Sequence, residues 1–577
     1  MKTSITEATW DLEDSIITMT KPPNVPLKDS YFYTTREDLD SLVFTGDRAT
    51  YDINTYELTV EGIPYITVAD SRIIPEGNRT TIRENSALDE FRNAEIIIDT
   101  LNGYHHLTRG KITVISRNKF EGSAFYQVTV DSDTFEIRFD TFFLKNVLVG
   151  KKKYQLMTVS GGEVPEEQNL KIAPGFFYKG SVEMFAYKQA LELDGQVRMN
   201  VQNIPNANEL WIPYTRRDSS IYPHIPLVNA IFEDGTQALA GVHNDIQGKL
   251  YSTFIEKRKA ETDFDFFNAK GELSFDPNTL NYKVETPTKT AGAYAGYTML
   301  YNDENSNVLI EGPATFLKPT TTDITISAAV TGTGNKLTNE YNLDCFLAMN
   351  YGVTDAIIDE MARDIVNAVE QMGANPANEA TDELLYKLAN IIGNQSAVKY
   401  REDQLSGYKS LVSASKELEK SLVISGVKMK WNPEFKAWHN TTKIGLSHVG
   451  RTDINAKMDG FLEIRRDESN EDVMNLFIQA SPETWYFISY NNHNLLMYSS
   501  NTLFNELVQS KSNAAKQKAG QLAFVVGDVN ETLGFVNSFR KNYFGIDTPY
   551  NLSFPSDANL EDKKFDTIEE EDDGFGF

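Results

Sequence analysis

Apolar and polar residues alternate with a period of two in a recurring strand–turn–strand pattern over the first 330 residues. The segment ATYDINTYELTVEGIPYITVAD (residues 49–70) has alternating apolar positions on both sides of a polar stretch that begins at Asp52. The segment NAEIIIDTLNGYHHLTRGKITVIS (residues 93–116) repeats this outline around Asp99. Weaker copies follow in SVEMFAYKQALELDGQVRMNV, GELSFDPNTLNYKVE and TMLYNDENSNVLIEGPATF. A period of two is typical of half-buried strands, and Asx, Gly and Pro residues supply turns, so the pattern predicts antiparallel hairpins.

A single hairpin is marginally stable, so the predicted hairpins must stack and cover one another's apolar faces. Glycines interrupt the returning strands and allow a bulge or a bend at Gly62, Gly110, Gly195 and Gly312. Stacked hairpins with bent strands indicate a jelly roll or a β-solenoid-like fold. Because these glycines are unequally spaced, unrelated hairpins of an ordinary antiparallel protein are the alternative to true repeats.

After residue 350 the period changes from two to about 3.6, which indicates a small helical unit between β regions. The segment TDAIIDEMARDIVNAVEQM places on one helix face Ile358, Met361, Ile365, Val369 and Met372. Thr354 is its expected N-cap, and Gly373 is expected to end it. A second helix, TDELLYKLANIIG, points inward Leu384, Leu388, Ile391 and Ile392. The segment REDQLSGYKSLVSASKELEKSLV predicts one or two further short helices.

Strands resume after this unit and continue to about residue 500, where NTLFNELVQSKSNAAKQKA and DVNETLGFVNSFRKNYFG each predict a helix. In the last helix we expect a buried set of Leu533, Val536, Phe539 and Tyr543, with Asn537 and Arg540 nearer water. The alternation breaks at residues 154–175 and 326–342, which indicates boundaries.

The expected fold class is mainly β, with stacked antiparallel hairpins of jelly-roll or β-solenoid type, an inserted small helical unit and an α+β C-terminal region. The expected division is a β repeat region at 1–153, a second β region at 154–340, a helical unit at 341–425, an α+β region at 426–560 and an acidic disordered tail at 561–577.

Composition restricts the classes of partner and site. The chain has 577 residues, a net charge of −27 and one cysteine, Cys345. Nucleic acids and anionic membranes bind proteins through a basic face. A chain with a strongly negative net charge lacks such a face, so we expect neither as the main partner. One cysteine excludes an intrachain disulfide framework and a multi-cysteine zinc site. Its place in the apolar run NLDCFLAMN predicts a buried, unreactive thiol.

No motif in the sequence indicates catalysis or a cofactor. The histidines form no HExxH pair, and His105 and His106 lie in a predicted strand, so their rings are expected on opposite faces. The segment GLSHVGRT (residues 445–452) has arginine in place of the P-loop lysine and precedes a predicted strand, which favours a hairpin loop. Acidic clusters at residues 130–135 and 262–267 lack the EF-hand order and predict solvated turns. We therefore expect no enzyme activity, cofactor or metal site.

The strand unit of residues 49–70 resembles the repeat of the OstA-like family of lipopolysaccharide-transport proteins, whose repeats build a bent β-jelly roll. The matching positions are Ala49, Tyr51, Asp52, Leu58, Gly62 and Tyr65, and those of a second copy are Ala94, Ile98, Asp99, Leu107, Gly110 and Ile112. Tyr65 follows a proline, and later copies lose either the aspartate or the glycine, so the resemblance covers the first copies. It implies a groove that carries lipid or lipopolysaccharide, with candidate lining residues Tyr51, Leu58, Val60 and Ile98.

The whole chain also resembles the C-terminal part of very large, uncharacterised cell-envelope proteins of Gram-negative bacteria. The resemblance lies in YFYTTREDLDSLVFTGDRATYDI, GKLYSTFIEKRKAETDFDFFNAKGELSFD and SGVKMKWNPEFKAWHNTTKIGLSHVGRTDINAKMDGFLEI. It implies the periplasm or the outer membrane as the location, and the N-terminal part of a longer chain as a partner. The first residues, MKTSITEATWDLEDSI, lack the pattern of a secretory signal, so a cytoplasmic protein is the alternative.

Three functions follow as hypotheses. The first is a non-enzymatic cell-envelope β scaffold that is structural or carries lipid along a groove. The second is an interaction module of a secretion or surface assembly that binds other envelope proteins through residues 350–422 and the acidic tail. The third, a hydrolase with dispersed carboxylates, requires a deep pocket with strongly perturbed acids.

Overall fold

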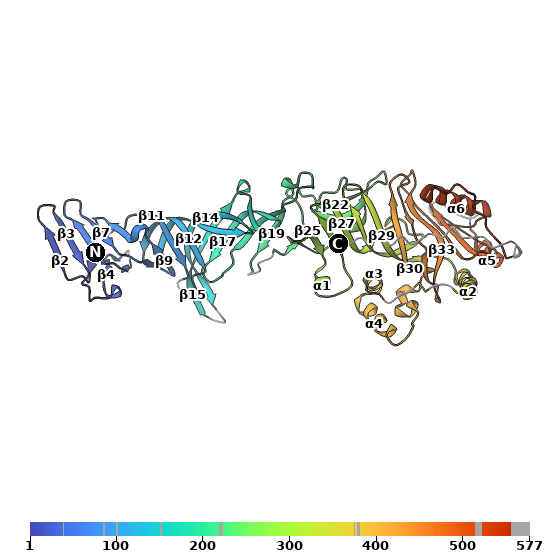
Figure 1. Cartoon of the computed structure of the whole chain (residues 1–577), viewed down its shortest axis with the longest axis horizontal. Helices are drawn as coiled ribbons and strands as arrows, with labels where there is room; N and C mark the ends of the chain where they lie inside the picture. Colours follow the sequence, from blue (N-terminus) through green and yellow to red (C-terminus); the bar gives the residue numbers. More distant parts are fainter. Residues whose placement is uncertain are drawn as a thin grey trace. The chain divides into compact units, whose positions relative to one another are not determined.

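The computed structural model describes the chain except residues 38–39, 85–86, 100–101, 150–152, 219–222, 374–375, 378–380, 514–521 and 556–577, and except the side chains of residues 149, 153 and 155. The chain divides into two compact units, Met1–Pro223 and His224–Phe577 (Figure 1). Both are built on antiparallel sheets, and helices cover the sheet of the second unit, so the prediction of a mainly β protein is confirmed. The predicted tail at 561–577 lies outside the described residues.

The first unit begins with a five-stranded sheet in the order β10-β7-β6-β3-β2 and a three-stranded sheet in the order β1-β4-β5. The strands are β1 (Lys2–Thr3), β2 (Ala8–Asp11), β3 (Ile16–Thr20), β4 (Tyr31–Tyr33), β5 (Val43–Thr45), β6 (Arg48–Asp52), β7 (Glu57–Glu61) and β10 (Arg79–Ile82). One row of cross-strand neighbours consists of threonines: Thr9, Thr18, Thr50, Thr59 and Thr81. The opposite face includes the buried Val60, near Phe32 of the small sheet, so the period of two separates a polar face from an apolar one.

An eleven-stranded antiparallel sheet follows in the order β19-β18-β17-β15-β14-β13-β12-β11-β9-β8, with β16 beside β17. The strands are β8 (Ile66–Val68), β9 (Ser71–Ile74), β11 (Phe91–Ile98), β12 (His105–Ser116), β13 (Lys119–Val130), β14 (Asp133–Val149), β15 (Lys153–Val164), β16 (Leu170–Ala173), β17 (Phe176–Phe185), β18 (Glu192–Met199) and β19 (Ile212–Arg216). Gly195 faces Gly180 across β17 and β18, and a Cβ on Gly195 would lie 2.2 Å from the carbonyl oxygen of Lys179. This close approach explains the glycine in that strand.

The structure corrects the phase of the alternation beyond Gly62. The sequence pattern predicts that Tyr65 continues the apolar face, whereas Ile66 and Val68 are fully buried and Tyr65 is exposed. Gly62 has a φ of 74°, and Pro64 lies two residues after it. The chain therefore turns between the five-stranded and the eleven-stranded sheets. After this turn Ile66 and Val68 face the core, and Tyr65 does not.

The two segments that the sequence pattern predicts as boundaries contain strands. Residues 154–164 belong to β15, which pairs with β14 from Lys153 to Gly162. Residues 326–342 lie mostly in the hairpin of β28 (Thr325–Asn335) and β29 (Glu340–Asn350). The glycines that suggested breaks are strand glycines at crowded positions, since a Cβ on Gly162 would lie 2.5 Å from the carbonyl oxygen of Arg138. The compact units divide at Pro223 instead.

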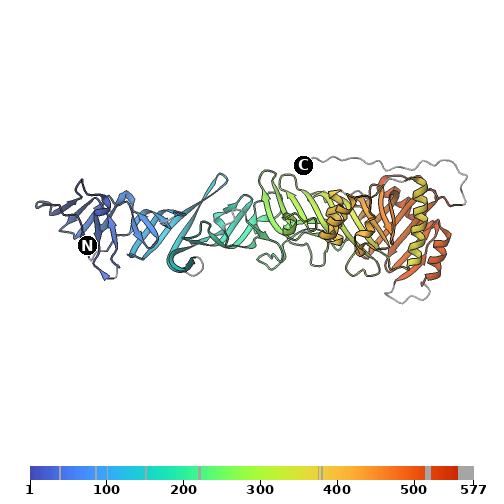
Figure 2. The same ribbon diagram turned by 90° about the horizontal axis from the view of Figure 1, so that it is seen from below.

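The second unit contains a fifteen-stranded sheet and a three-stranded sheet, β22-β21-β23. Beyond β28 and β29, the large sheet contains β20 (Ile225–Pro226), β24 (Glu272–Asp276), β25 (Asn281–Glu285), β26 (Thr298–Asn302), β27 (Asn307–Ala314), β30 (Leu422–Asn432), β31 (Ala437–Asn440), β32 (Ile444–Val449), β33 (Thr452–Arg466), β34 (Asp472–Ser481), β35 (Thr484–Asn491), β36 (Asn494–Ser499) and β37 (Ala523–Val526). The small sheet contains β21 (Leu239–Asn244), β22 (Leu250–Glu256) and β23 (Phe264–Asn268). Figure 2 shows the successive strands of this unit, coloured from green to orange. The hairpin predicted at residues 445–452 is confirmed by β32 and β33.

Helices form at residues 355–372, 382–392, 502–511 and 529–544, where the sequence period predicts them, whereas the helix at 287–290 has no predicted counterpart and that at 394–404 only overlaps the predicted segment 401–423. They are α1 (Pro287–Thr290), α2 (Asp355–Met372), α3 (Asp382–Ile392), α4 (Asn394–Gln404), α5 (Thr502–Lys511) and α6 (Val529–Phe544), with short 3-10 turns at Leu411–Ala414 and Lys416–Leu418. Thr354 and Gly373 bound α2 as expected. Met372, predicted to be inward, is exposed in the last turn of α2. None of the helices in the described ranges is long and apolar enough to cross a bilayer.

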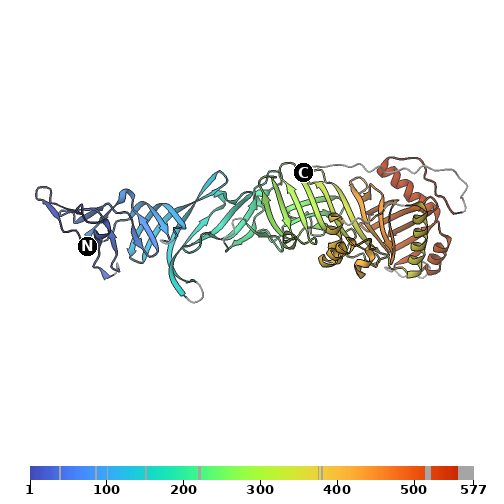
Figure 3. The same ribbon diagram turned by 60° about the horizontal axis from the view of Figure 1, so that its bottom comes forward.

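Helices cover both faces of the large sheet. Neighbouring residues of a strand point to opposite faces, and in β35 Tyr486 donates a hydrogen bond to Asp364 of α2, whereas Phe487 stacks on Phe535 of α6. Figure 3 shows α2 in yellow and α6 in red on different sides of the orange strands. After α6, the side chains of Tyr550, Leu552 and Phe554 pack on Phe477 and Trp485. Residues 546–555, which we call the terminal strap, therefore extend the cover of this sheet face.

The helical unit is part of the sheet's core. Leu384, Leu388 and Ile392 of α3 are buried with Phe346 of β29 and Val423 of β30. The predicted unit at 341–425 therefore starts within β29 and ends within β30, and its helices cannot be separated from the sheet that they cover.

We expect Leu388→Ala to lower the free energy of unfolding by about 2–5 kcal/mol, because it leaves a cavity between α3 and the sheet. Leu405, 84 % exposed at the end of α4, supplies the matched control, and Leu405→Ala should change stability by less than about 0.5 kcal/mol. Urea unfolding of the full chain measures both. Equal small effects would show that α3 is not integral to the core.

Candidate functional site under helix α6

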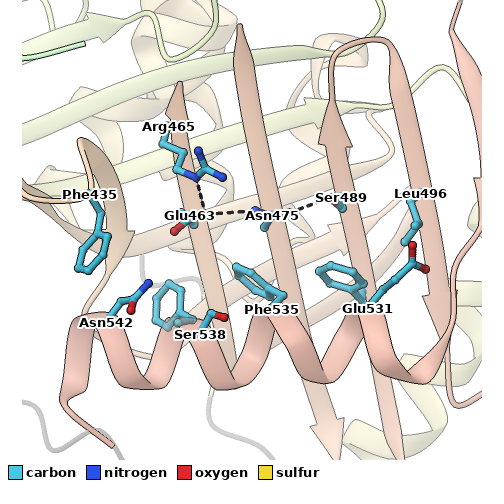
Figure 4. A pocket seen from close by; sticks show the side chains of 12 residues that line it. Phe435, Glu463, Arg465, Asn475, Ser489, Leu496, Glu531, Phe535, Ser538 and Asn542 are labelled. Atoms are coloured by element: carbon cyan, nitrogen blue, oxygen red, sulfur yellow. Dashed lines mark hydrogen bonds and ion pairs between the residues drawn. The ribbon is translucent and has the colours of Figure 1, made fainter. Parts of the chain in front are cut away.

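A cleft of about 510 Å³ lies between α6 and strands β33 to β36 (Figure 4). Three further cavities among the described residues are smaller, with volumes of about 20, 220 and 180 Å³. The volume of the cleft falls within the range of roughly 300–1,000 Å³ that is typical of small-molecule sites. The cleft is therefore the candidate functional site of the second unit.

Helix α6 forms the outer wall of the cleft. Asp528 accepts hydrogen bonds from the backbone N–H groups of Asn530 and Glu531, and Glu531 accepts one from the backbone N–H of Asp528, which completes a capping box. From this fixed start, Glu531, Phe535, Ser538 and Asn542 recur at helical spacing along one stripe of α6. Figure 4 shows this stripe along the cleft.

A polar row across the sheet forms the floor of the cleft. Glu463 of β33, Asn475 of β34 and Ser489 of β35 are direct cross-strand neighbours, and Leu496 of β36 follows them. Ser489 donates a hydrogen bond of 2.7 Å to Asn475 Oδ1, and Asn475 Nδ2 donates one of 3.1 Å to Glu463. The next row on the same face contains Phe461, Phe477 and Phe487, so the polar row interrupts an otherwise aromatic face.

Glu463 is a buried carboxylate that other side chains hold in place. Its Oε1 accepts a hydrogen bond of 2.6 Å from the Tyr543 hydroxyl, and its Oε2 accepts bonds from Asn475 and from Arg465 Nε at 3.3 Å. Burial of the Tyr543 ring edge, together with the negative charge of Glu463, raises the pKa of Tyr543. The phenol therefore stays protonated and remains a donor to Glu463.

His439 of β31 is the cross-strand neighbour of Glu463 on the other side. Its ring stacks on Tyr543 with a centroid separation of 4.1 Å and an interplanar angle of 11°. Burial lowers the pKa of His439 to about 4, so the imidazole is neutral at pH 7. The histidine packs as an aromatic ring and carries no charge into the site.

Four polar groups of three residues at the cleft have no side-chain partner within the described part of the chain. They are the two Nη groups of Arg465, the hydroxyl of Ser538 and the amide of Asn542. Aromatic rings stand beside them, with Phe487 and Phe535 stacked at 5.5 Å and Phe435 in edge contact with Tyr543 at 5.5 Å. The cleft thus offers hydrogen-bond donors and acceptors next to the partly exposed rings of Phe435 and Phe535.

The carboxyl groups whose pKa values are clearly shifted provide no general acid. The carboxyl groups whose pKa values shift clearly all shift downward, because hydrogen bonds, in most cases with neighbouring cations, outweigh burial: Glu166, Asp234, Asp265, Asp276 and Glu285. A carboxyl general acid at neutral pH needs a raised pKa. Among the described residues no group of three or more His, Cys, Asp and Glu side chains could hold a metal ion.

The residues predicted to line a lipid groove lie in the first unit, in two different sheets. Val60 of β7 and Ile98 of β11 are fully buried, and Tyr51 and Leu58 are partly buried cross-strand neighbours of β6 and β7. The structure thus brings Tyr51, Leu58 and Val60 to one sheet and places Ile98 in another.

Sequence reasoning missed the cleft as a site. It identified Phe539 and Tyr543 as inward residues of α6 but expected Arg540 nearer water, whereas Arg540 is buried and donates a hydrogen bond to the Thr548 carbonyl oxygen. The available signal was the alternation in β33, in which Glu463 and Arg465 occupy the same face as Phe461. Charged residues at core-facing positions mark a polar site inside an apolar face.

Comparisons of the chain with models of protein families, with curated proteins and with solved structures find no match. The function must therefore be argued from the geometry.

We expect the neutral state of His439 to make stability depend on pH. Between pH 6.5 and about 4 the unfolded chain binds a proton at this histidine and the folded chain does not, so stability falls as the pH falls through this window. His439→Phe keeps a ring on Tyr543 and removes this term. Between pH 7 and pH 5 wild-type protein should lose on the order of 2 kcal/mol more stability than the variant, measured by urea unfolding. Parallel pH profiles would contradict the assignment.

Proposed function

We propose that the protein is a non-enzymatic β scaffold of the cell envelope whose C-terminal unit binds a saccharide in the cleft under α6. The observation that carries the binding proposal is the combination of unpartnered Arg465, Ser538 and Asn542 groups with the partly exposed rings of Phe435 and Phe535. Sugar hydroxyls both donate and accept hydrogen bonds, and the C–H faces of a sugar ring pack on aromatic rings.

The same site favours binding over catalysis. Both oxygens of Glu463 already accept hydrogen bonds, and Glu531 is held in a capping box. A general base or acid must be free to exchange a proton with the substrate, and His439, held neutral by burial, lies behind Tyr543. The arrangement favours a preformed recognition surface.

The scaffold part of the proposal is supported by the continuity of the sheets. Each strand of the eleven-stranded and the fifteen-stranded sheet pairs with its neighbours, so apolar surface is buried along the whole sheet rather than in isolated hairpins. The resemblance of residues 49–70 and 93–116 to lipopolysaccharide-transport repeats supports an envelope location. Lipid transport along a groove receives less support, because Val60 and Ile98 are fully buried.

A docking role is the second candidate. Leu405 and Tyr408 are strongly exposed where α4 ends, although the rest of the helical unit packs on the sheet. Exposed apolar side chains beside a rigid core suit contact with another envelope protein.

We expect the full chain to bind at least one of glucose, galactose, N-acetylglucosamine and their disaccharides, detected by saturation-transfer NMR. Ser538→Trp fills the cleft from an exposed helix position, and Arg465→Gln removes the unpartnered donors, so each should lower the affinity by about tenfold or more. Binding by neither wild type nor variants would overturn the saccharide proposal.

Gln509→Trp provides the matched control, because Gln509 is an exposed residue of α5, which does not line the cleft. Its affinity should equal that of the wild type. A loss equal to that of Ser538→Trp would show that binding occurs elsewhere.

A further inference from the structure

Three rows of side chains cross the sheet face that α6 covers. Every second residue of a strand points to the same face, so β34 contributes Asn475, Phe477 and Gln479 to successive rows. The cross-strand pairs that continue these rows into β35 are Asn475↔Ser489, Phe477↔Phe487 and Gln479↔Trp485. At about 3.4 Å per residue along a strand, successive rows are about 7 Å apart.

The first row is the polar floor of the cleft, and the second row lies beneath α6. Phe487 of the second row stacks on Phe535 of α6, and Phe477 belongs to the same buried cluster as Val536. Figure 4 shows how α6 crosses the strands at this place. The cleft therefore lies along one side of the helix.

The terminal strap covers the third row, on the other side of α6. The Tyr550 hydroxyl donates a hydrogen bond to Gln479 Oε1. Trp485 Nε1 donates one of 2.8 Å to the Ser553 carbonyl oxygen, and the Phe554 ring contacts the Trp485 ring at 5.5 Å. Helix α6 thus lies between the cleft and the strap.

The strap is also bonded to α6 itself. Asn537 Oδ1 accepts a hydrogen bond of 2.7 Å from the backbone N–H of Tyr550, and Arg540 donates one of 2.6 Å to the Thr548 carbonyl oxygen. Arg540 follows Ser538 of the cleft stripe by two residues, which is about 200° around an α-helix. The strap therefore holds the side of α6 that faces away from the cleft.

The third row explains why the strap matters for the position of the helix. Trp485 is fully buried in the presence of the strap. Without the strap, its ring would lie bare beside α6, and burial of apolar surface would favour a shift of the helix toward it. A shift by one row would move Ser538 away from the polar floor by about 7 Å and widen the cleft.

We propose that the terminal strap positions α6 and thereby sets the width of the cleft, with Asn537, Arg540 and Trp485 as positioning residues. The cleft lining within the described part of the chain contains none of these three, so they act through the helix and the strap. The effect on ligand affinity rests on the proposed saccharide site, whereas the effect on the position of α6 does not. A cleft of fixed width spares the ligand the cost of ordering the helix.

The experiment measures the position of α6 in the full chain by double electron–electron resonance between nitroxides on Gly534→Cys and Glu468→Cys. Labelling is selective because Cys345 is fully buried, and a Cβ on Gly534 meets no atom within 4 Å. Glu468 is exposed in the β33–β34 turn, at the end of these strands that is nearer to the cleft row. Tyr550→Ser/Phe554→Ser should lengthen the distance by about 3–7 Å, up to one row.

The same double variant should lower the affinity for glucose, galactose or N-acetylglucosamine, whichever the wild type binds, by at least about fivefold. A finer pair of variants isolates one contact. Asn537→Ala removes the acceptor for Tyr550 and should change distance and affinity in the same directions. Asn537→Asp keeps an acceptor oxygen at this position and should restore both to wild-type values.

Leu388→Ala is the matched control, because it destabilises the unit through α3 and should change neither the distance nor the affinity. An unchanged distance in the strap variant, an equal change in Leu388→Ala, or a longer distance with unchanged affinity would overturn the proposal. Wild-type protein that binds none of these sugars would remove the proposed function, and the distance would still decide whether the strap positions α6.

Discussion

Every apolar sheet face in this protein needs a cover, and this requirement organises the structure. In β35 consecutive residues reach opposite layers: Tyr486 bonds to α2, and Phe487 stacks on α6. The fifteen-stranded sheet therefore has a core on each side, unlike an antiparallel sheet with one wet face. The helical unit meets the same requirement, because α3 covers Phe346 of β29 and Val423 of β30.

The cleft under α6 is a place where this cover is incomplete. Under α6, the polar row of Glu463, Asn475 and Ser489 keeps helix and sheet from closing on an aromatic face. Rigid strands carry the polar groups of the cleft floor, which preorganises them for a partner.

The sequence predicts the elements far better than their assembly. Periods of two and 3.6 locate the hairpins and α2, α3 and α6, because local spacing decides which residues share a face. They do not place the unit boundary at Pro223 or the phase of Tyr65, because these depend on how neighbouring strands meet. The sequence pattern does not predict the cleft for a similar reason. Glu463 and Tyr543 are 80 residues apart, and their hydrogen bond forms only when α6 packs across β33.

The terminal strap has a consequence for how this unit acquires its structure. Trp485 donates its indole hydrogen bond to the carbonyl oxygen of Ser553, and Tyr550 and Phe554 lie on the same face. During translation β35 leaves the ribosome before residues 529–555 do, so this aromatic surface is uncovered during that interval. The second unit can therefore complete its fold only after residue 555 has been synthesised, and until then chaperones that recognise aromatic surface have a binding site on the nascent chain.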